Sequence, residues 1–523
     1  MFNLSDILSN SAKRYPKNEA VVCGETRLTY EALEQKSNQF ANGLLTLGIK
    51  PGNKVAFGCP NVPNFLVIYY GILKTGAVAV PISIMLKTEE IEHQLTNTDA
   101  KAFFCYSSTA KLPFEEFGNE AFSKVNSCAH FIIIDDDPCE ETTTPSHKTL
   151  SSLIKNQSTS FVPYLAQENE TAVIIHTSGT TGIQKGAELT HANLTMNAMV
   201  VSTSNVANIQ SYDRLLAALP LNHVFGQTVM MNAGILSGAT IVLMPRFDPN
   251  KVFQVMDDEN ITIFSGVPTM FWAMLRSKTE NIDLEKVARN LKTVISGGDS
   301  LPVEIFNNFK AKYNIEITEG YGMTEGSPVV TFSHKDKPLK PGSIGTALWG
   351  VEIKLIDDSG KEVKTGEMGE IIFKGFNVMK GYYNNPKGTE EVLKNGWMHS
   401  GDLAFMDTEG FIFIMGRKKE LIIRSGLNVY PKEVEMVLMK HKSISMVCVV
   451  GVPDKIKGEE VKAFAVLKPN QEITPSEIRS WVNERIASYK CPKHIEFVKA
   501  LPMNATGKIL KRELKNGHWY ELN

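Results

Sequence analysis

The chain has 523 residues, and its 55 Lys and Arg nearly balance its 57 Asp and Glu, which leaves a formal net charge of −2. This balance argues against a strongly basic nucleic-acid-binding protein, so we expect no nucleic-acid partner. A composition of 43% hydrophobic and 21% charged residues is typical of a globular protein and excludes collagen-like and low-complexity chains.

Helix and strand patterns alternate through the first half of the chain. Apolar spacing predicts helices over 30–47, 64–74 and 225–236. Short apolar runs predict buried strands at 55–58, 77–82, 171–176, 214–219 and 240–244. This alternation predicts an α/β fold with much parallel strand pairing.

The pattern changes after residue 340. Short segments with Asp/Asn/Gly turns predict a β-rich subdomain over 342–416. An α+β pattern follows, with helices over 431–440 and 475–486 and strands near 446–450 and 461–467. We therefore expect a large N-terminal domain of residues 1–416, a hinge at 417–420 and a small mobile lid domain of residues 421–523.

A glycine- and hydroxyl-rich segment follows the predicted strand that ends at His176. Its candidate phosphate-binding residues are Thr177, Ser178, Gly179, Thr180, Thr181, Gly182 and Lys185. Backbone N–H groups in such a bend form an anion-binding concavity. It is not a Walker A loop, because Gly186 follows the lysine where that motif needs Ser or Thr. Composition alone favours an ordinary polar turn, because Gly and Thr are common in turns.

Together with ordered motifs further along, this segment resembles the adenylate-forming enzymes: acyl-CoA synthetases, luciferases and peptide-synthetase adenylation domains. The segments 266–270, 377–383 and 504–508 are most similar to those of bacterial long-chain fatty-acid–CoA ligases. The motif Tyr321-Gly322-Met323-Thr324-Glu325 belongs to this resemblance. It implies that Tyr321 stacks on adenine, that Thr324 binds the α-phosphate, and that Glu325 helps to hold Mg²⁺, a cation that prefers oxygen ligands.

The resemblance implies further nucleotide contacts. Gly297, Gly298 and Asp299 would line the adenine pocket, although a helix-capping role for Asp299 is an equal alternative. Asp402 would accept hydrogen bonds from the ribose, and Arg417 would contact the nucleotide.

Further resemblances concern catalysis and the second substrate. Lys508 is implied to be the catalytic lysine, which stabilises the charge that develops between the carboxylate and the α-phosphate. His223 would border the acyl pocket, Lys419 would be the hinge residue, and Ser425 and Gly426 would line the coenzyme A tunnel. Taken alone, each residue also has an ordinary structural explanation.

The resemblance implies an ATP-dependent ligase that activates a medium- to long-chain fatty acid through acyl-AMP, with Mg²⁺ as cofactor and coenzyme A as co-substrate. Alternatives are a ligase for an aryl or other small acid, an acyl-AMP ligase that serves a carrier protein, and a nucleotide-binding regulator without turnover. A Rossmann dehydrogenase is excluded, because no GxGxxG follows a strand near the start.

The cellular setting is predicted from absences in the sequence. The seven cysteines form no CxxC pair, which argues against zinc or a disulfide framework and favours a reducing compartment. The first ten residues show no signal-peptide pattern, and no stretch is apolar enough to span a bilayer. We expect a cytoplasmic monomer or homodimer, with peripheral membrane contact left open.

Overall fold

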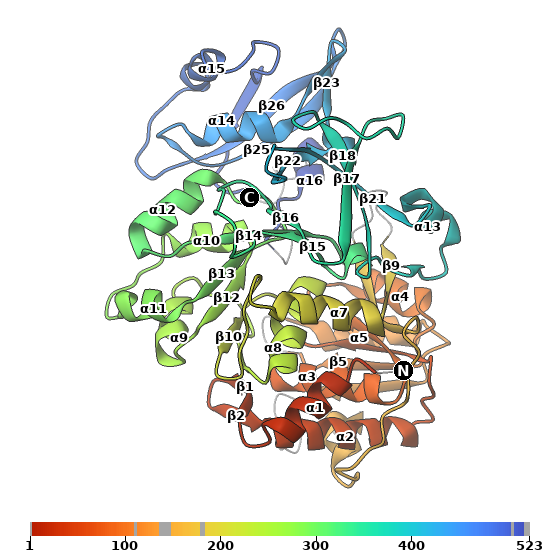
Figure 1. Ribbon diagram of the computed structural model, residues 1–523. Coiled ribbons are helices and arrows are strands. Elements are labelled where there is room, and N and C mark those ends of the chain that lie inside the picture. Colours follow the sequence, from red (N-terminus) through yellow and green to blue (C-terminus); the bar gives the residue numbers. More distant parts are fainter. Residues whose placement is uncertain (1–2, 109–111, 135–147, 178–183, 504–506, 517–523) are drawn as a thin grey trace.

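The computed structural model describes residues 3–108, 112–134, 148–177, 184–503 and 507–516 (Figure 1). Within these ranges the strands form four sheets that helices connect, which confirms the predicted α/β class. Figure 1 shows the C-terminal elements, in blue, stacked on the green elements of the larger N-terminal part. Among the described residues, no helix combines the length and the apolar character needed to cross a membrane.

The first sheet carries one wall of the later site. Its spatial order is β16 (Thr346–Ala347), β15 (Val329–Phe332), β14 (Thr318–Gly322), β13 (Thr293–Ser296), β12 (Ile263–Gly266), β10 (Arg214–Ala217), β11 (Thr240–Leu243), β1 (Glu19–Cys23) and β2 (Thr26–Thr29). All neighbours from β14 to β1 in this order pair in parallel. The carboxyl ends of β13 and β14 therefore lie at one edge of the sheet, where ligands of α/β proteins commonly bind.

The second sheet carries the glycine-rich segment. Its order is β19 (Gly381–Tyr382), β9 (Lys185–Thr190), β8 (Thr171–Thr177), β4 (Val78–Ile82), β3 (Lys54–Gly58), β5 (Ala102–Tyr106), β6 (His130–Ile134) and β7 (Lys148–Thr149). β8 and β9 are antiparallel, and Thr177 pairs with Lys185. Lys185 and Gly186 were expected in a loop, but they belong to β9, because Ala187 and Leu189 are buried and extend the pairing.

Helices between and beside these two sheets share one continuous core. They are α1 (Asp6–Arg14), α2 (Tyr30–Thr46), α3 (Pro63–Lys74), α4 (Thr88–Asn97), α5 (Phe114–Ser123), α6 (Leu150–Ile154), α7 (His191–Ser202), η1 (Gly226–Asn232) and α8 (Ala233–Ser237). The predicted helix over 225–236 begins as the π-helix η1 and continues as α8. In η1, Gln227 and Asn232 are fully buried and bond to the hydroxyls of Tyr69 and Tyr70.

A separate core covers the other face of the first sheet. The helices on this side are α9 (Val252–Asp258), α10 (Pro268–Met274), α11 (Leu284–Asn290) and α12 (Val303–Tyr313). Phe271 of α10 packs edge-on against Phe264 and Phe309. α10 begins with Pro268 at a first helical position, where the missing N–H costs no hydrogen bond. The strand β12 therefore leads directly into a rigid, well-packed helix.

The predicted β-rich subdomain is an antiparallel sheet. It contains β17 (Val351–Ile356), β18 (Gly369–Gly375), β20 (Leu393–Lys394), β21 (Trp397–Met406) and β22 (Ile412–Arg417). The helix α13 (Pro386–Val392) was not predicted. The segment Asn384-Asn385-Pro386 suggested only a turn, but Asn385 accepts a hydrogen bond from the Gly388 N–H and caps a helix that begins at Pro386.

The C-terminal part has its own sheet and core. Its elements are β23 (Ile422–Arg424), β24 (Leu427–Val429), α14 (Pro431–Met439), β25 (Ile444–Asp454), β26 (Gly458–Leu467), α15 (Pro475–Asn483), β27 (His494–Phe497) and α16 (Lys511–Asn516). Ile422, Val434, Val461 and Ile478 are among its buried core residues. The short 3₁₀ turn η3 (Lys418–Glu420) joins β22 to β23, at the position of the predicted hinge.

Candidate active site

A cavity of about 1170 Å³ lies between the N-terminal part and the C-terminal sheet. The structure brings most of the sequence-predicted site residues to its walls. They are Thr177, Lys185, His223, Gly297, Gly298, Asp299, Tyr321, Gly322, Met323, Thr324, Glu325, Asp402, Arg417, Lys419 and Lys508. Ser178, Gly179, Thr180, Thr181 and Gly182 lie outside the described residues. The cavity therefore collects side chains from segments more than 300 residues apart.

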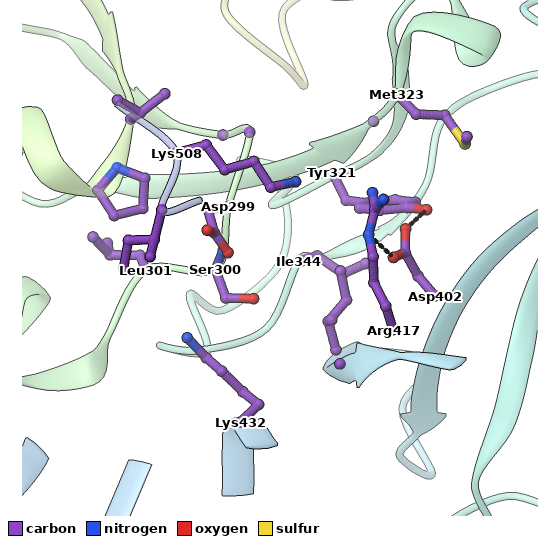
Figure 2. A pocket seen from close by; sticks show the side chains of 18 of the residues that line it. Asp299, Ser300, Leu301, Tyr321, Met323, Ile344, Asp402, Arg417, Lys432 and Lys508 are labelled. Atoms are coloured by element: carbon purple, nitrogen blue, oxygen red, sulfur yellow. Dashed lines mark hydrogen bonds and ion pairs between the residues drawn. The ribbon is translucent and has the colours of Figure 1, made fainter. Parts of the chain in front are cut away.

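A hydrogen-bonded triad forms one wall of the cavity (Figure 2). The Tyr321 hydroxyl donates to Asp402 Oδ2 at 2.7 Å, and Arg417 Nε lies 3.0 Å from Asp402 Oδ1. Burial and the Asp402 carboxylate both raise the pKa of Tyr321, so the tyrosine is a neutral donor. An ionised carboxylate offers about four acceptor positions, so Asp402 can accept further hydrogen bonds from a ligand hydroxyl.

The turn after β14 places Thr324 and Glu325 beside this wall. A Cβ atom at Gly322 would lie 2.1 Å from the Pro328 carbonyl oxygen, so a glycine is required where the strand meets the returning chain. Thr324 and Glu325 follow in the 3₁₀ turn η2 (Thr324–Gly326) and face the cavity. The sequence motif is thus a tight connection that presents a hydroxyl and a carboxylate to one space.

Glu325 belongs to a small group of polar side chains from three segments. Its Oε1 accepts a hydrogen bond from the Tyr382 hydroxyl at 2.6 Å. Lys185 Nζ lies 5.0 Å from the centre of the Tyr382 ring and 3.7 Å from Glu391 Oε2. The Lys185 cation and the Glu325 carboxylate therefore both contact one tyrosine, the first over its ring and the second at its hydroxyl, and both residues line the cavity, where such charges suit phosphate oxygens and a cation.

Lys508 and Lys432 reach Asp299 from the C-terminal part (Figure 2). Desolvation disfavours the ionised form, but the charges of Lys508 and Lys432 and the Ser300 N–H together lower the pKa of Asp299. The capping alternative for Asp299 is wrong: α12 begins at Val303, and the Asp299 carboxylate accepts from the Ser300 N–H at 2.8 Å instead. Asp299 therefore interacts electrostatically with lysines of the C-terminal part.

His223 faces the cavity among apolar side chains. Burial lowers the pKa of His223 to about 4, so the imidazole is neutral at physiological pH and can donate one hydrogen bond and accept another. Apolar residues that share the cavity wall are Val201, Val224, Phe225, Val229, Ile295, Val329 and Phe332. The cavity therefore combines a polar, charged lining with a hydrophobic one.

Ser425 and Gly426 are not brought to the cavity. They form the exposed turn between β23 and β24, with φ values of 53° and 79°. This left-handed backbone explains the glycine without any ligand. In the orientation described here, the predicted coenzyme A residues are exposed and do not line the cavity.

Three residues of the site region carried no predicted role. Tyr382 was visible only as part of a Gly-Tyr-Tyr segment, and Lys432 is one ordinary lysine after a proline. Glu319 accepts from the N–H groups of Leu301 and Gly342 at 3.1 and 3.0 Å and so ties together two loops near the cavity. Burial raises the pKa of Glu319 to about 7 despite these hydrogen bonds. Only three-dimensional packing identifies these residues, because no local pattern marks them.

The comparison with protein families agrees with this geometry. Residues 8–383 match the model of the AMP-binding enzyme family, and residues 433–508 match that of the AMP-binding enzyme C-terminal domain. The chain belongs to the AMP-binding enzyme family, and more specifically to its AMP-forming acyl-CoA ligases. The resemblance inferred from the motifs is thereby confirmed.

Relatives with similar sequence identity to this chain are named for different carboxylic acid substrates. The chain is 34% identical to a long-chain-fatty-acid–CoA ligase of Bacillus subtilis, over 98% of this chain and 94% of that protein. It is 33% identical to a feruloyl-CoA synthase of an Amycolatopsis species, over 96% of each chain. The solved structure of the anthranilate CoA ligase AuaEII with anthranoyl-AMP aligns with a TM-score of 0.90 at 26% identity, over 99% of this chain and 97% of that one. These comparisons define the reaction class and leave the acid open.

Proposed function

We propose that the protein converts a medium- to long-chain fatty acid, ATP and coenzyme A into acyl-CoA, AMP and pyrophosphate through an acyl-AMP intermediate. One observation carries this proposal. A single cavity combines Lys508, Thr324, Glu325, Asp402 and Arg417 with a lining of apolar side chains. The polar groups suit a nucleotide and a carboxylate, and the apolar lining suits an uncharged hydrocarbon chain.

In the first half-reaction, a carboxylate oxygen of the acid attacks the α-phosphorus of ATP, and the bond to the pyrophosphate oxygen breaks. Residues 177–185 would bind the departing pyrophosphate, and Asp402 and Arg417 would hold the nucleoside. Lys508 and Thr324 would stabilise the negative charge that develops on the α-phosphate. Holding both reactants in line supplies much of the rate, because effective molarities can reach ~10⁵ M or more.

Glu325 fits the role of a magnesium ligand. Its carboxylate is buried, lines the cavity and keeps acceptor positions beyond the Tyr382 hydrogen bond. Mg²⁺ in such enzymes uses one or two carboxylates together with substrate phosphates and water, and it neutralises phosphate charge when bound. Within the described ranges, no group of three or more His, Cys, Asp or Glu could hold a metal. Glu325 would therefore act together with the triphosphate.

In the second half-reaction, the thiol of coenzyme A attacks the acyl carbonyl and AMP leaves. We infer that residues 421–523 rotate as a lid about Lys419 and the hinge 417–420, so that Lys508 withdraws and Ser425 and Gly426 approach the thiol's path. The exposed position of Ser425 and Gly426 in this structure is consistent with a second orientation of the lid. Such a rotation needs only a few boundary residues to change their backbone angles. A cytoplasmic location stays a prediction of the sequence.

An aryl acid is the second candidate substrate. The feruloyl-CoA synthase relative and the anthranilate CoA ligase structure favour it. Phe225 and Phe332 in the cavity wall could stack against an aromatic ring as well as line a hydrocarbon tunnel. An acyl-AMP ligase that serves a carrier protein is a weaker alternative, distinguished by its failure to use free coenzyme A.

The test is an acid panel with purified protein, ATP and Mg²⁺, with and without coenzyme A. The acids run from acetate to oleate and include benzoate and ferulate, and mass spectrometry follows AMP, acyl-AMP and acyl-CoA. Thioesters of C8 to C18 acids support the proposal, whereas turnover of only the aromatic acids moves the protein to the second candidate. Acyl-AMP without thioester indicates a carrier-protein acceptor, and no AMP from any acid contradicts the enzymatic function.

A further inference from the structure

The helix α10 contacts the C-terminal part through residues on one of its faces. Thr269 and Trp272 belong to α10, and Arg276 follows shortly after its end at Met274. Their spacing of three and four residues puts the three side chains on one side of a helix. We call this set, Thr269, Trp272 and Arg276, the α10 face.

The first contact of the α10 face lies directly beside Lys508. The Thr269 hydroxyl donates to the Gly507 carbonyl at 3.0 Å. A Cβ atom at Gly507 would lie 2.4 Å from Thr269 Oγ1, and Gly507 has a φ of 76°. Glycine is thus required both by the backbone angle and by the close approach of the two segments. The residue before Lys508 is therefore fixed against α10.

The second contact involves the start of β25. Trp272 Nε1 donates to the Ser445 carbonyl at 3.1 Å and lies 3.2 Å from its hydroxyl oxygen. Arg276 donates to the same hydroxyl, and its guanidinium carbon lies 3.7 Å from the centre of the Trp272 ring. Trp272 and Arg276, which stack on each other, therefore bind Ser445 through both its main-chain carbonyl and its side-chain hydroxyl.

The two contacts are connected through a small hydrophobic core. Met446, next to Ser445, packs in a cluster with Leu501 and Leu514, which flank Lys508 in sequence, and Trp272 packs against this cluster. Ser445 and Gly507 are therefore two attachment points of one rigid unit. Two points of attachment restrain rotation of that unit in a way that one hydrogen bond cannot.

We propose that the α10 face positions Lys508 in the cavity by holding Gly507 and Ser445, and that it acts in adenylate formation and not in thioester formation. This inference rests on the proposed function of Lys508 as the lysine of adenylation. In the second lid orientation the three residues would separate from Gly507 and Ser445, so their loss would not affect that step. The α10 residues are positioning residues, because they act through Lys508.

The test compares the two half-reactions in Thr269→Val, which keeps the shape but removes the donor, and in Trp272→Phe, which removes Nε1–H. Acyl-AMP formation is measured with ATP and palmitate, or with benzoate if the acid panel selects it, and thioester formation is measured from supplied acyl-adenylate. A neutral hydrogen bond corresponds to a loss of roughly two- to tenfold. We expect this loss in kcat of the first step, little change in KM for ATP, and an unaltered second step.

Controls separate positioning from a general structural effect. Thr269→Ser keeps a donor and should restore the rate, and Lys278→Ala, an exposed residue just beyond the α10 face, should change neither step. In a Lys508→Ala background, Thr269→Val should cause no further loss, because the two changes act through one group.

Three outcomes overturn the inference. The first is an equal loss of rate in both half-reactions, and the second is that neither Thr269→Val nor Trp272→Phe slows acyl-AMP formation. The third is that Thr269→Val slows acyl-AMP formation further in the Lys508→Ala background. If Lys508→Ala itself forms acyl-AMP at the normal rate, the proposed function of Lys508 fails instead. The two failures are therefore distinguishable.

Discussion

The two walls of the cavity are built in different ways. The nucleotide wall, around Asp402, consists of the buried side chains of Tyr321 and Asp402 and the partly exposed Arg417, which bond to one another. The lid wall carries Lys432 on the helix α14 and Lys508 in the chain before α16, in a part of the molecule with its own core. The α10 face, Thr269, Trp272 and Arg276, contacts this part. The first wall is held by its own hydrogen bonds, whereas in the proposed mechanism the second depends on the orientation of the lid. Substitutions in the two walls should therefore affect different steps.

The largest effect is expected in the lid wall, at Lys508. Lys508→Ala should slow acyl-AMP formation by about 10²- to 10³-fold, the usual cost of removing one group that stabilises developing charge. Thioester formation from supplied acyl-adenylate should stay within about twofold of the wild type, because the proposed lid rotation withdraws Lys508 from the cavity in that step. Single-turnover measurements of each half-reaction by mass spectrometry check this.

The matched control for Lys508→Ala is Lys499→Ala, an exposed lysine of the same part of the chain that does not line the cavity. It should alter neither step. Equal loss of both half-reactions in Lys508→Ala would remove the lysine from its assigned role and would weaken the contrast between the two walls.

The next effect is expected in the nucleotide wall. Asp402→Asn keeps the shape but replaces one acceptor oxygen by an NH₂ group, so that either Tyr321 or Arg417 loses its partner. Hydrogen bonds to charged groups are worth about 1.5–3 kcal/mol, which corresponds to roughly 10- to 150-fold in KM for ATP. Both half-reactions should suffer, because in the proposed mechanism the nucleotide stays bound to this wall throughout.

The control for Asp402→Asn is Asp407→Asn, whose carboxylate pairs with Lys340 outside the cavity. Steady-state kinetics at varied ATP concentration measures both variants. An unchanged KM for ATP in Asp402→Asn would show that this wall does not bind the nucleotide.

A smaller and selective effect is expected at the junction of the two walls. Lys419→Pro fixes φ near −65° in the turn η3 and should slow thioester formation severalfold while acyl-AMP formation persists. Lys419→Ala keeps the backbone freedom and serves as the control. Rapid-quench measurement of acyl-CoA from supplied acyl-adenylate separates the two variants, and normal thioester formation in Lys419→Pro would place the hinge elsewhere.

Much of the fold follows from periodicity, because strongly patterned segments specify their own structure. The helix predicted over 30–47 is α2 (Tyr30–Thr46), and the strand predicted over 171–176 is β8 (Thr171–Thr177). The predictions were wrong or incomplete where tertiary packing determines the secondary structure. α13 is invisible in a segment of turn residues, and the π-helical part of 226–232 depends on buried partners from α3, which no local pattern contains.

The site was predictable only where residues form a short motif. Tyr321 to Glu325 share one strand end and its turn, so a local pattern records them. Lys432, Tyr382 and Thr269 reach the same cavity from three different elements, and their chemistry is ordinary until the fold brings them together. The contrast between the two walls is likewise a property of contacts and not of any linear segment.

The smallest effect on catalysis is expected from His191, which begins α7 in the N-terminal part and does not line the cavity. Its Nδ1 accepts a hydrogen bond from the Leu4 N–H at 3.0 Å, and burial lowers its pKa to about 4 from an ordinary value of 6.5. The unfolded chain therefore binds a proton more readily below pH 6.5, and stability that is fully present above that pH is lost as the pH falls toward 4. Between pH 7 and 5.5 this loss amounts to about 1 kcal/mol of unfolding free energy.

His191→Asn keeps an acceptor oxygen near the Leu4 N–H but cannot be protonated. His191→Asn should reduce the loss of unfolding free energy between pH 7 and 5.5 by about 1 kcal/mol and leave both half-reactions unchanged at pH 7. His494→Asn, at an exposed histidine of β27, serves as the control. Urea unfolding followed by fluorescence at pH 5.5 and 7 measures the difference between each variant and the wild type. If His191→Asn instead slowed adenylate formation at pH 7, the nucleotide wall would depend on distant packing and could not be regarded as preorganised independently of the rest of the N-terminal part.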